Sequence, residues 1–163
     1  MNAMKKGEVN IRPMERRDID TILAIYNKTK RERMPGIKQS RIIYRTALTY
    51  DEVASTDLGS SLDLSFVSEV NGQVVGFIWG RLAYVGIPVE EVGLIHMLVV
   101  DPDYQRRGIA RRLVNALGER CQAKGIDAIR VIIDEHDWEL GDFFQRLGFH
   151  RSELAIYIKT ARS

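Results

Sequence analysis

Two periods of apolar residues run along this chain and together predict a mixed α/β domain. Short apolar or alternating stretches predict strands over 9–12, 62–70, 73–84, 92–100, 128–133 and 154–159. Apolar residues at spacings of three and four predict helices that start near residues 18, 109 and 137. We expect a further helix over 40–53, then a polar loop over 54–61. No internal repeat or linker is visible, so residues 1–163 are expected to form one domain.

Turn residues give the directions of these strands. Asn71-Gly72 stands between two of them and is a strong signal for a two-residue hairpin, because both turn positions need a positive φ. The strand over 92–100 then extends an antiparallel meander. A strand, a helix and a strand with a short crossover follow, which predicts that 94–100 and 128–133 are parallel neighbours. The predicted fold class is α/β, a meander followed by a parallel pair, with helices on the faces of the sheet.

Composition and charge are those of an ordinary globular chain. Of the 163 residues, 45% are hydrophobic and 28% are charged, which suits a domain with a sizeable core. A net charge of +2 is too small to predict a nucleic-acid partner. The single cysteine, Cys121, allows no intrachain disulfide, and its place on an apolar helix face predicts a core residue. The sequence shows no signal-peptide core and no bilayer-length apolar run, so we expect a cytoplasmic protein without a membrane partner.

The stretch 94–112, LIHMLVVDPDYQRRGIARR, carries the clearest chemical signal. An apolar strand stops at Asp101-Pro102, and a short polar loop leads through Gly108 into a helix. The free amides and the dipole of a helix N-terminus favour an anion, and a glycine lets a phosphate approach the backbone. Positive charge beside these amides comes from Arg106, Arg107, Arg111 and Arg112. The stretch therefore predicts a phosphate-binding loop.

These residues resemble the acetyl-CoA-binding motif of the GCN5-related N-acetyltransferases, the GNAT superfamily. The motif is Gln/Arg-x-x-Gly-x-Gly/Ala after an apolar strand, and it stands here as Gln105, Gly108 and Ala110. A second resemblance is the stretch 143–149, FFQRLGF, because the family commonly has an aromatic residue four positions before a Gly-Phe pair. The order of predicted elements resembles the GNAT fold over about 9–158.

The resemblance implies an acetyl-CoA-dependent N-acetyltransferase in which the two parallel strands splay apart. The pantetheine arm of acetyl-CoA would pair with the backbone at Leu98, Val99 and Val100. The pyrophosphate would bind the loop that begins at Gln105, at the amides of Arg106, Arg107, Gly108, Ile109, Ala110 and Arg111. Asp137 and Phe144, which stand where many members have Asn and Tyr, are assigned to the same acyl-CoA site. The acceptor would be a primary amine of a small molecule or a protein, and no metal is expected.

The attacking amine must lose a proton, and His96 is the sharpest candidate for the base. It stands within an apolar strand next to the expected splay, and an unperturbed imidazole is mostly neutral at pH 7. Strand alternation predicts that it shares a face with Leu94 and Leu98, opposite Ile95 and Met97. A similar histidine occurs in the arylalkylamine N-acetyltransferases of this superfamily. Two alternatives stay open: a structural histidine, and a carboxylate acting through water, namely Glu91 or Glu90.

The sequence offers no clear acid for the leaving thiolate. Phe144 cannot donate a proton, and Tyr84 and Tyr157 are weak substitutes. This departure keeps a second function open, a non-catalytic acyl-CoA-binding regulatory domain. A nucleotide-binding module is a third reading, but the loop lacks the Lys-Ser/Thr of a P-loop.

Three further features bear on partners. The basic run over 28–45 is either a lid over the substrate or a solvated surface. An acidic group, which would attract a cationic amine or cap a helix, comprises Asp134, Glu135, Asp137, Glu139 and Asp142. One strand follows Phe149 where the family usually has two, so a second subunit is expected to cover the open sheet edge, giving a homodimer.

Overall fold

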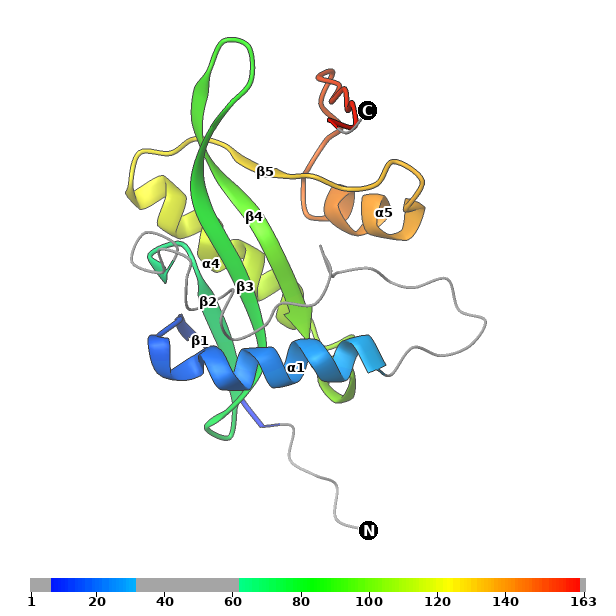
Figure 1. Cartoon of the computed structure of the whole chain (residues 1–163). Helices are drawn as coiled ribbons and strands as arrows, with labels where there is room; N and C mark the ends of the chain where they lie inside the picture. Colours follow the sequence, from blue (N-terminus) through cyan, green and yellow to red (C-terminus); the bar gives the residue numbers. More distant parts are fainter. Residues whose placement is uncertain (1–6, 32–61, 162–163) are drawn as a thin grey trace.

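The computed structural model describes residues 7–31 and 62–161 and contains one five-stranded sheet in the order β1-β2-β3-β4-β5 (Figure 1). The strands are β1 (Val9–Pro13), β2 (Phe66–Val70), β3 (Gln73–Val85), β4 (Glu90–Val100) and β5 (Ile129–Val131). The helices are α1 (Ile19–Arg31), α4 (Ile109–Ala123) and α5 (Trp138–Arg146), with short 3-10 turns η1 (Arg16–Asp18) and η2 (Pro102–Tyr104). In the described residues, no helix has the length and apolar character needed to cross a membrane.

The sheet has the predicted directions. β1 to β4 pair antiparallel in sequence order, and β4 pairs parallel with β5. Asn71 and Gly72 connect β2 to β3 with φ values of 52° and 76°, as their residue types predict for a tight hairpin. The meander and the parallel pair are therefore confirmed.

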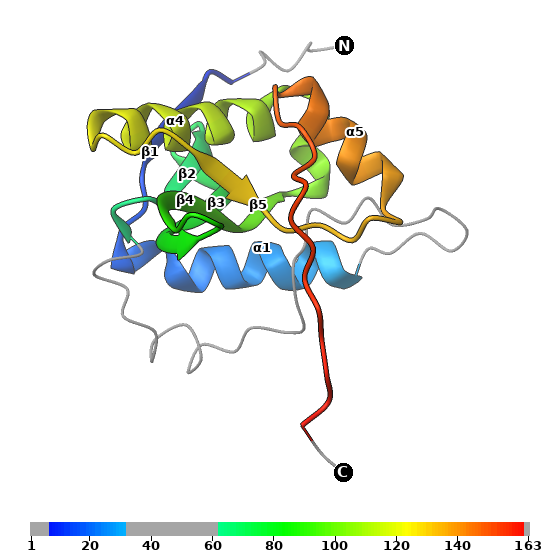
Figure 2. The same cartoon turned by 90° about the horizontal axis from the view of Figure 1, so that it is seen from above.

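Helices cover both faces of the sheet, with α1 on one face and α4 on the other (Figure 2). The α4-side core holds Leu113, Leu117 and the predicted core residue Cys121, which is 1% exposed. The α1-side core holds Ile22 and Tyr26. Each helix buries the apolar stripe that its sequence period predicts.

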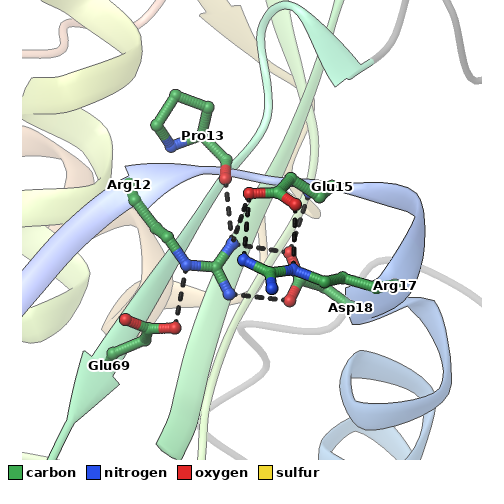
Figure 3. Close-up of polar contacts among 6 residues, drawn as sticks. All are labelled: Arg12, Pro13, Glu15, Arg17, Asp18 and Glu69. Carbon is green, nitrogen blue, oxygen red and sulfur yellow. Dashed lines mark hydrogen bonds and ion pairs between the residues drawn. The ribbon is translucent and has the colours of Figure 1, made fainter. Parts of the chain in front are cut away.

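An ionic cluster fixes the entry into α1 (Figure 3). Arg12 on β1 donates two hydrogen bonds of 2.8 Å to the buried carboxylate of Asp18, and a third of 2.8 Å to Glu69 on β2. Burial alone would raise the pKa of Asp18, but hydrogen bonds from Arg12 and from the Glu15 amide outweigh it and hold that pKa below its usual value. The cluster joins the first two strands to the start of α1.

Three expectations about strands need correction, and two others cannot be compared. β2 starts at Phe66 rather than at residue 62, because residues 62–64 form a turn closed by a hydrogen bond from the Ser65 amide to the Leu62 carbonyl. β5 spans only Ile129–Val131 of the predicted 128–133, because it separates from β4 after Val131. The predicted strand over 154–159 is absent, because no strand in the described residues pairs with it. The expected helix over 40–53 and loop over 54–61 lie outside the described residues.

Candidate active site

The two parallel strands separate partway along β4. β5 pairs only with Gly93, Leu94 and Ile95, where the Gly93 amide donates a 3.0 Å hydrogen bond to the Ala128 carbonyl. β4 continues to Val100 while β5 turns away from it (Figure 1). Within the described residues, the β5-side edge of β4 therefore has no partner strand beyond Ile95. This is the divergence that the resemblance to the GNAT family implied.

The backbone of this open edge alternates in direction. The Asp101 amide donates to the Val75 carbonyl of β3 at 2.8 Å, so Asp101 and Val99 direct their polar groups towards β3. Leu98 and Val100 then direct theirs towards the open edge. Of the three residues expected to pair with pantetheine, Leu98 and Val100 therefore have backbone groups at the open edge, whereas those of Val99 face β3.

A β-bulge marks the point of divergence, and His96 is its extra residue. Trp79 pairs with Met97 while the next residue, Gly80, pairs with Ile95, so the strand register skips His96. Position 80 beside the bulge has room only for glycine, because a Cβ there would lie 2.5 Å from the Leu64 carbonyl oxygen.

The bulge corrects the prediction about which residues share a face. Ile95 and Leu98 belong to the α4-side core, whereas Met97 belongs to the α1-side core, so Ile95 and Met97 do not share a face. The half-buried His96 ring lies edge-on to Trp79 of the α1-side core, with the ring centroids 5.8 Å apart. Strand alternation did not predict this contact between His96 and Trp79.

The loop from β4 to α4 is held by side chains at both ends. Asp101 accepts a 3.0 Å hydrogen bond from the Asp103 amide, and Gln105 donates one of 3.0 Å to the Val100 carbonyl. Lys28 on α1 reaches across and donates to Asp101 at 2.9 Å and to Asp103 at 2.7 Å, and both carboxylates raise its pKa. No sequence pattern indicated this contact, because Lys28 is remote along the chain and belongs to a run interpreted as a lid or a solvated surface.

The start of α4 has the features of an anion site. Gly108 is its N-cap residue with a φ of 76°, no side chain caps the helix, and its first turn has no acidic residue. A Cβ at Gly108 would meet no atom of the described structure within 4 Å, so the backbone is open on that side. Arg106 also has a positive φ, of 62°. Ile109 is 2% exposed and fixes the first turn to the core, while Ala110 is half-buried. These residues fit a phosphate group.

The four arginines of this loop differ in their present contacts. Arg107 lies over the Tyr104 ring at 5.0 Å, Arg111 donates to the Arg146 carbonyl at 3.5 Å, and Arg112 donates to the Val9 carbonyl at 2.7 Å. Arg106 makes no hydrogen bond or ion pair to any residue in the described ranges. Arg106 is thus the arginine whose charge is most available to a ligand.

The α5 residues assigned to acyl-CoA have structural contacts. Phe144 is 3% exposed and packs edge-on between Phe143 and Phe149, with ring centroids 5.1 and 5.2 Å away. Asp137 caps α5 by accepting a 3.2 Å hydrogen bond from the Leu140 amide, which confirms the capping interpretation for this residue.

The rival base and acid candidates lie elsewhere. Glu91 is five residues before His96 on β4, roughly 16 Å away at the usual rise of a strand. Its carboxylate accepts a 2.9 Å hydrogen bond from Tyr84, and this bond raises the pKa of the Tyr84 hydroxyl. Glu90 pairs with Arg130 at 3.2 Å, and Tyr157 is 95% exposed. Nothing in the described structure brings these four candidates together with His96.

Some carboxylates of the acidic group over 134–142 form hydrogen bonds or ion pairs with nearby residues. Asp134 accepts a hydrogen bond from the His136 amide at 2.9 Å, and Glu135 pairs with Arg151 at 2.8 Å.

No group of three or more metal-binding side chains gathers anywhere in the described ranges. The expectation that the reaction needs no metal stays a prediction.

Comparison with known proteins identifies the family. The acetyltransferase (GNAT) family model matches residues 24–149, which include the divergence, the loop and α5. This chain belongs to the GNAT family. The resemblance inferred from Gln105, Gly108 and Ala110 is therefore confirmed.

Individual relatives agree with this assignment. The chain is 30% identical over 149 residues to an uncharacterised N-acetyltransferase of Methanocaldococcus jannaschii, a match that covers 88% of this chain and 62% of that protein. The chain thus spans less than two thirds of that relative's length.

Solved structures share the GNAT fold. A possible acetyltransferase from Clostridium difficile 630 superposes with a TM-score of 0.71 at 18% identity, covering 95% of this chain and 99% of that one. The aminoglycoside N-acetyltransferase AAC(6')-Iy, in complex with CoA, superposes with a TM-score of 0.69 at 18% identity, covering 99% and 100%. At these identities the likeness shows the fold alone.

Proposed function

We propose that this GNAT protein transfers the acetyl group of acetyl-CoA to a primary amine. The observation that carries the proposal is the continuity between the open edge of β4 and the uncapped N-terminus of α4. A ligand with a chain that hydrogen-bonds like a strand and ends in a pyrophosphate matches both parts at once. The CoA bound to one structural neighbour supports the same ligand class.

Each part of acetyl-CoA would have its own binding residues. The pantetheine amides would pair with Leu98 and Val100, because these residues direct their backbone to the open edge. The pyrophosphate would accept hydrogen bonds from amides between Arg106 and Arg111, where the helix dipole favours negative charge. Gln105 holds the loop between β4 and α4 in place by donating a hydrogen bond to the Val100 carbonyl.

The chemical step would be direct attack on the thioester. The amine nitrogen forms a bond to the acetyl carbon, the C–S bond breaks, and the proton lost by nitrogen goes to a base. We propose His96 as that base, since the bulge sets its ring at the divergence beside Trp79. Glu91 acting through water is the second candidate for the base, because its carboxylate already accepts a hydrogen bond from the Tyr84 hydroxyl.

The leaving thiolate would depart without a proton from α5. Phe144 has no acidic proton and is buried among aromatic rings, and Tyr157 lies far out on an exposed segment. A CoA thiolate is a moderately stable leaving group at neutral pH, because thiols have pKa values near 8.5. The thiolate would therefore take its proton from solvent.

A regulatory domain that binds acyl-CoA without turnover is the second candidate function. The observation that favours it is the same buried Phe144, since many family members carry Tyr at this position. The two functions share their binding site and differ only in chemistry, so binding and turnover must be measured separately.

The first experiment is a calorimetric titration of the purified protein with acetyl-CoA, and with dephospho-CoA, ATP and NAD for comparison. Selective, saturable binding of acetyl-CoA supports the proposed site. Equal binding of ATP or NAD, or no binding, contradicts it. A thiol-release assay over a panel of amines and peptides then distinguishes enzyme from regulator, because only an enzyme releases CoA at a rate that depends on the amine.

We also propose a class of acceptor and a cellular location. The exposed carboxylate of Asp134 beside β5 favours a cationic amine. The lone buried Cys121 suits the cytoplasm, where thiols stay reduced. The small net charge of +2, and the contacts that most loop arginines make with the protein itself, give no support for a nucleic-acid partner.

A further inference from the structure

Ile132 is a large aliphatic residue that lies exposed where β4 and β5 begin to diverge. Ile95 and Val131 form the last pair between the two strands, which separate from this point (Figure 1). The next residue on β4 is His96, and the next residue after β5 is Ile132. Ile132 is 54% exposed and, among the described residues, belongs to neither hydrophobic core. Position 132 therefore lies across the start of the divergence from the proposed base.

Ile132 and His96 are also on the same face of the sheet. Val131 and Ile133, which flank Ile132, both pack against the α4-side core, so the alternation of an extended chain directs Ile132 towards the α1 face. The His96 ring is on this face as well, because it lies 5.8 Å from the ring of Trp79 in the α1-side core. An imidazole and an exposed aliphatic side chain thus flank the same opening.

We propose that Ile132 selects the acceptor by favouring an amine whose nitrogen is attached to an apolar carbon chain. The inference rests on the proposed function, in which His96 takes the proton from the attacking nitrogen. A nitrogen within reach of His96 has its first carbon atoms in the opening between the strands, beside Ile132. An apolar chain would bury the exposed isoleucine, whereas a charged or hydroxylated chain would lose water there without gaining a hydrogen bond from it.

The charged residues nearest to Ile132 along the chain have other contacts. Arg130, two residues before it, pairs with Glu90 at 3.2 Å. Asp134, two residues after it, accepts a 2.9 Å hydrogen bond from a backbone amide of its own turn and is exposed. Asp134 would attract the ammonium form of any amine from solution, and Ile132 would contact the carbon chain of the bound amine. Selection by Asp134 favours a second positive charge on the acceptor, whereas selection by Ile132 disfavours it.

The test compares two acceptors of the same size, butylamine and 1,3-diaminopropane, by the rate of thiol release from acetyl-CoA. They differ at the end of the chain, which is a methyl group in the first and an ammonium group in the second. We expect kcat/KM of the wild type to be about ten-fold higher for butylamine, since one methylene group in an apolar site changes specificity by about 10- to 200-fold. Ile132→Asp should remove this preference, because a carboxylate would replace the apolar contact and attract the ammonium group.

The ratio of the two kcat/KM values isolates this contact, because a change at His96 or in acetyl-CoA binding affects both acceptors. Ile87→Asp makes the same substitution at an 88% exposed site on the β3–β4 turn and should leave the ratio unchanged. Ile132→Val and Ile132→Thr give side chains of the same shape at an exposed position, so both variants should fold. The valine variant should keep the preference for butylamine, and the threonine variant should lose most of it.

Two results would overturn the inference while leaving acetyl transfer in place. One is a ratio for Ile132→Asp equal to that of the wild type, which would mean that Ile132 does not contact the acceptor. The other is a wild-type preference for 1,3-diaminopropane that Asp134→Asn abolishes, which would assign the selection to Asp134. An absence of thiol release with every amine tested would contradict the proposed function itself, and the inference with it.

Discussion

The β4 side and the β5 side of the divergence differ in how much structure supports them. On the β4 side an eleven-residue strand, a capped turn and a fifteen-residue helix follow one another, with Lys28 bound across the turn. On the β5 side a three-residue strand leads to a nine-residue helix and an exposed segment. The difference agrees with the proposed function, in which the β4 side would bind and activate the acyl donor while the β5 side mainly packs.

The strongest test of this division is His96→Ala on the β4 side. General-base catalysis contributes typically about 10²- to 10⁴-fold, so we expect kcat for amine acetylation to fall within that range. The Kd for acetyl-CoA should stay unchanged, because the proposed binding atoms belong to the backbone of β4 and to the loop. Steady-state kinetics and calorimetry check the two values.

The matched variant is Glu91→Gln, which removes the rival carboxylate from the same strand. It should leave kcat within about two-fold of the wild type, because Glu91 precedes the bulge by five residues. A large loss with Glu91→Gln and none with His96→Ala would reassign the base to the carboxylate.

The next largest effect is expected for Gly108→Ala. A residue with a Cβ resists a φ of 76°, at a cost of about 1–2 kcal/mol, and relaxation of the loop turns the amides away from the phosphate. We expect the Kd for acetyl-CoA to rise about ten-fold. Calorimetric titration measures it.

Gly125→Ala is the matched control at the opposite end of α4. Gly125 has a φ of 75° and equally open surroundings, but it lies beyond the other end of α4. Both variants should lose similar thermal stability, and only Gly108→Ala should lose affinity. If both variants lost the same affinity for acetyl-CoA, the effect of Gly108→Ala would come from lower protein stability and not from the loss of a binding loop.

A smaller effect is expected for Lys28→Met, which removes both bonds from α1 to the β4–α4 turn. Because Lys28 is partly exposed, we expect the KM for acetyl-CoA to rise only two- to five-fold, with kcat nearly unchanged. Arg17→Met removes a more exposed ion pair from the η1 turn and should change neither constant. A loss of kcat with an unchanged KM would place Lys28 on the acceptor side instead.

The features that the sequence predicted are those encoded by neighbouring residues. The apolar run of β4, its stop at Asp101-Pro102 and the glycine before α4 follow one another along the chain, so local physics predicts a strand, a turn and an anion-binding helix start. The hairpin at Asn71-Gly72 was predictable for the same reason.

The features that the sequence did not predict depend on residues far apart in the chain. The bulge at His96 shifts the register between β3 and β4, where Gly80 packs against the distant Leu64 carbonyl. Simple alternation does not foresee a bulge and assigned Ile95 and Met97 to the same face. The strand over 154–159 has the composition of a strand but no partner within the described chain. Composition predicts a tendency to pair, and only the fold decides whether a partner is present.

The smallest effect on catalysis is expected on the β5 side, for Phe144→Tyr. Its ring is enclosed by Phe143 and Phe149, so a new hydroxyl would be buried without a partner and lower the stability by about 1–3 kcal/mol. The turnover number should not rise, because a hydroxyl in the core cannot protonate the departing thiolate. Phe143→Tyr, at a less buried ring, should be tolerated better in thermal unfolding. A several-fold gain in kcat for Phe144→Tyr alone would show instead that the hydroxyl reaches the sulfur, and that the β5 side takes part in the chemistry.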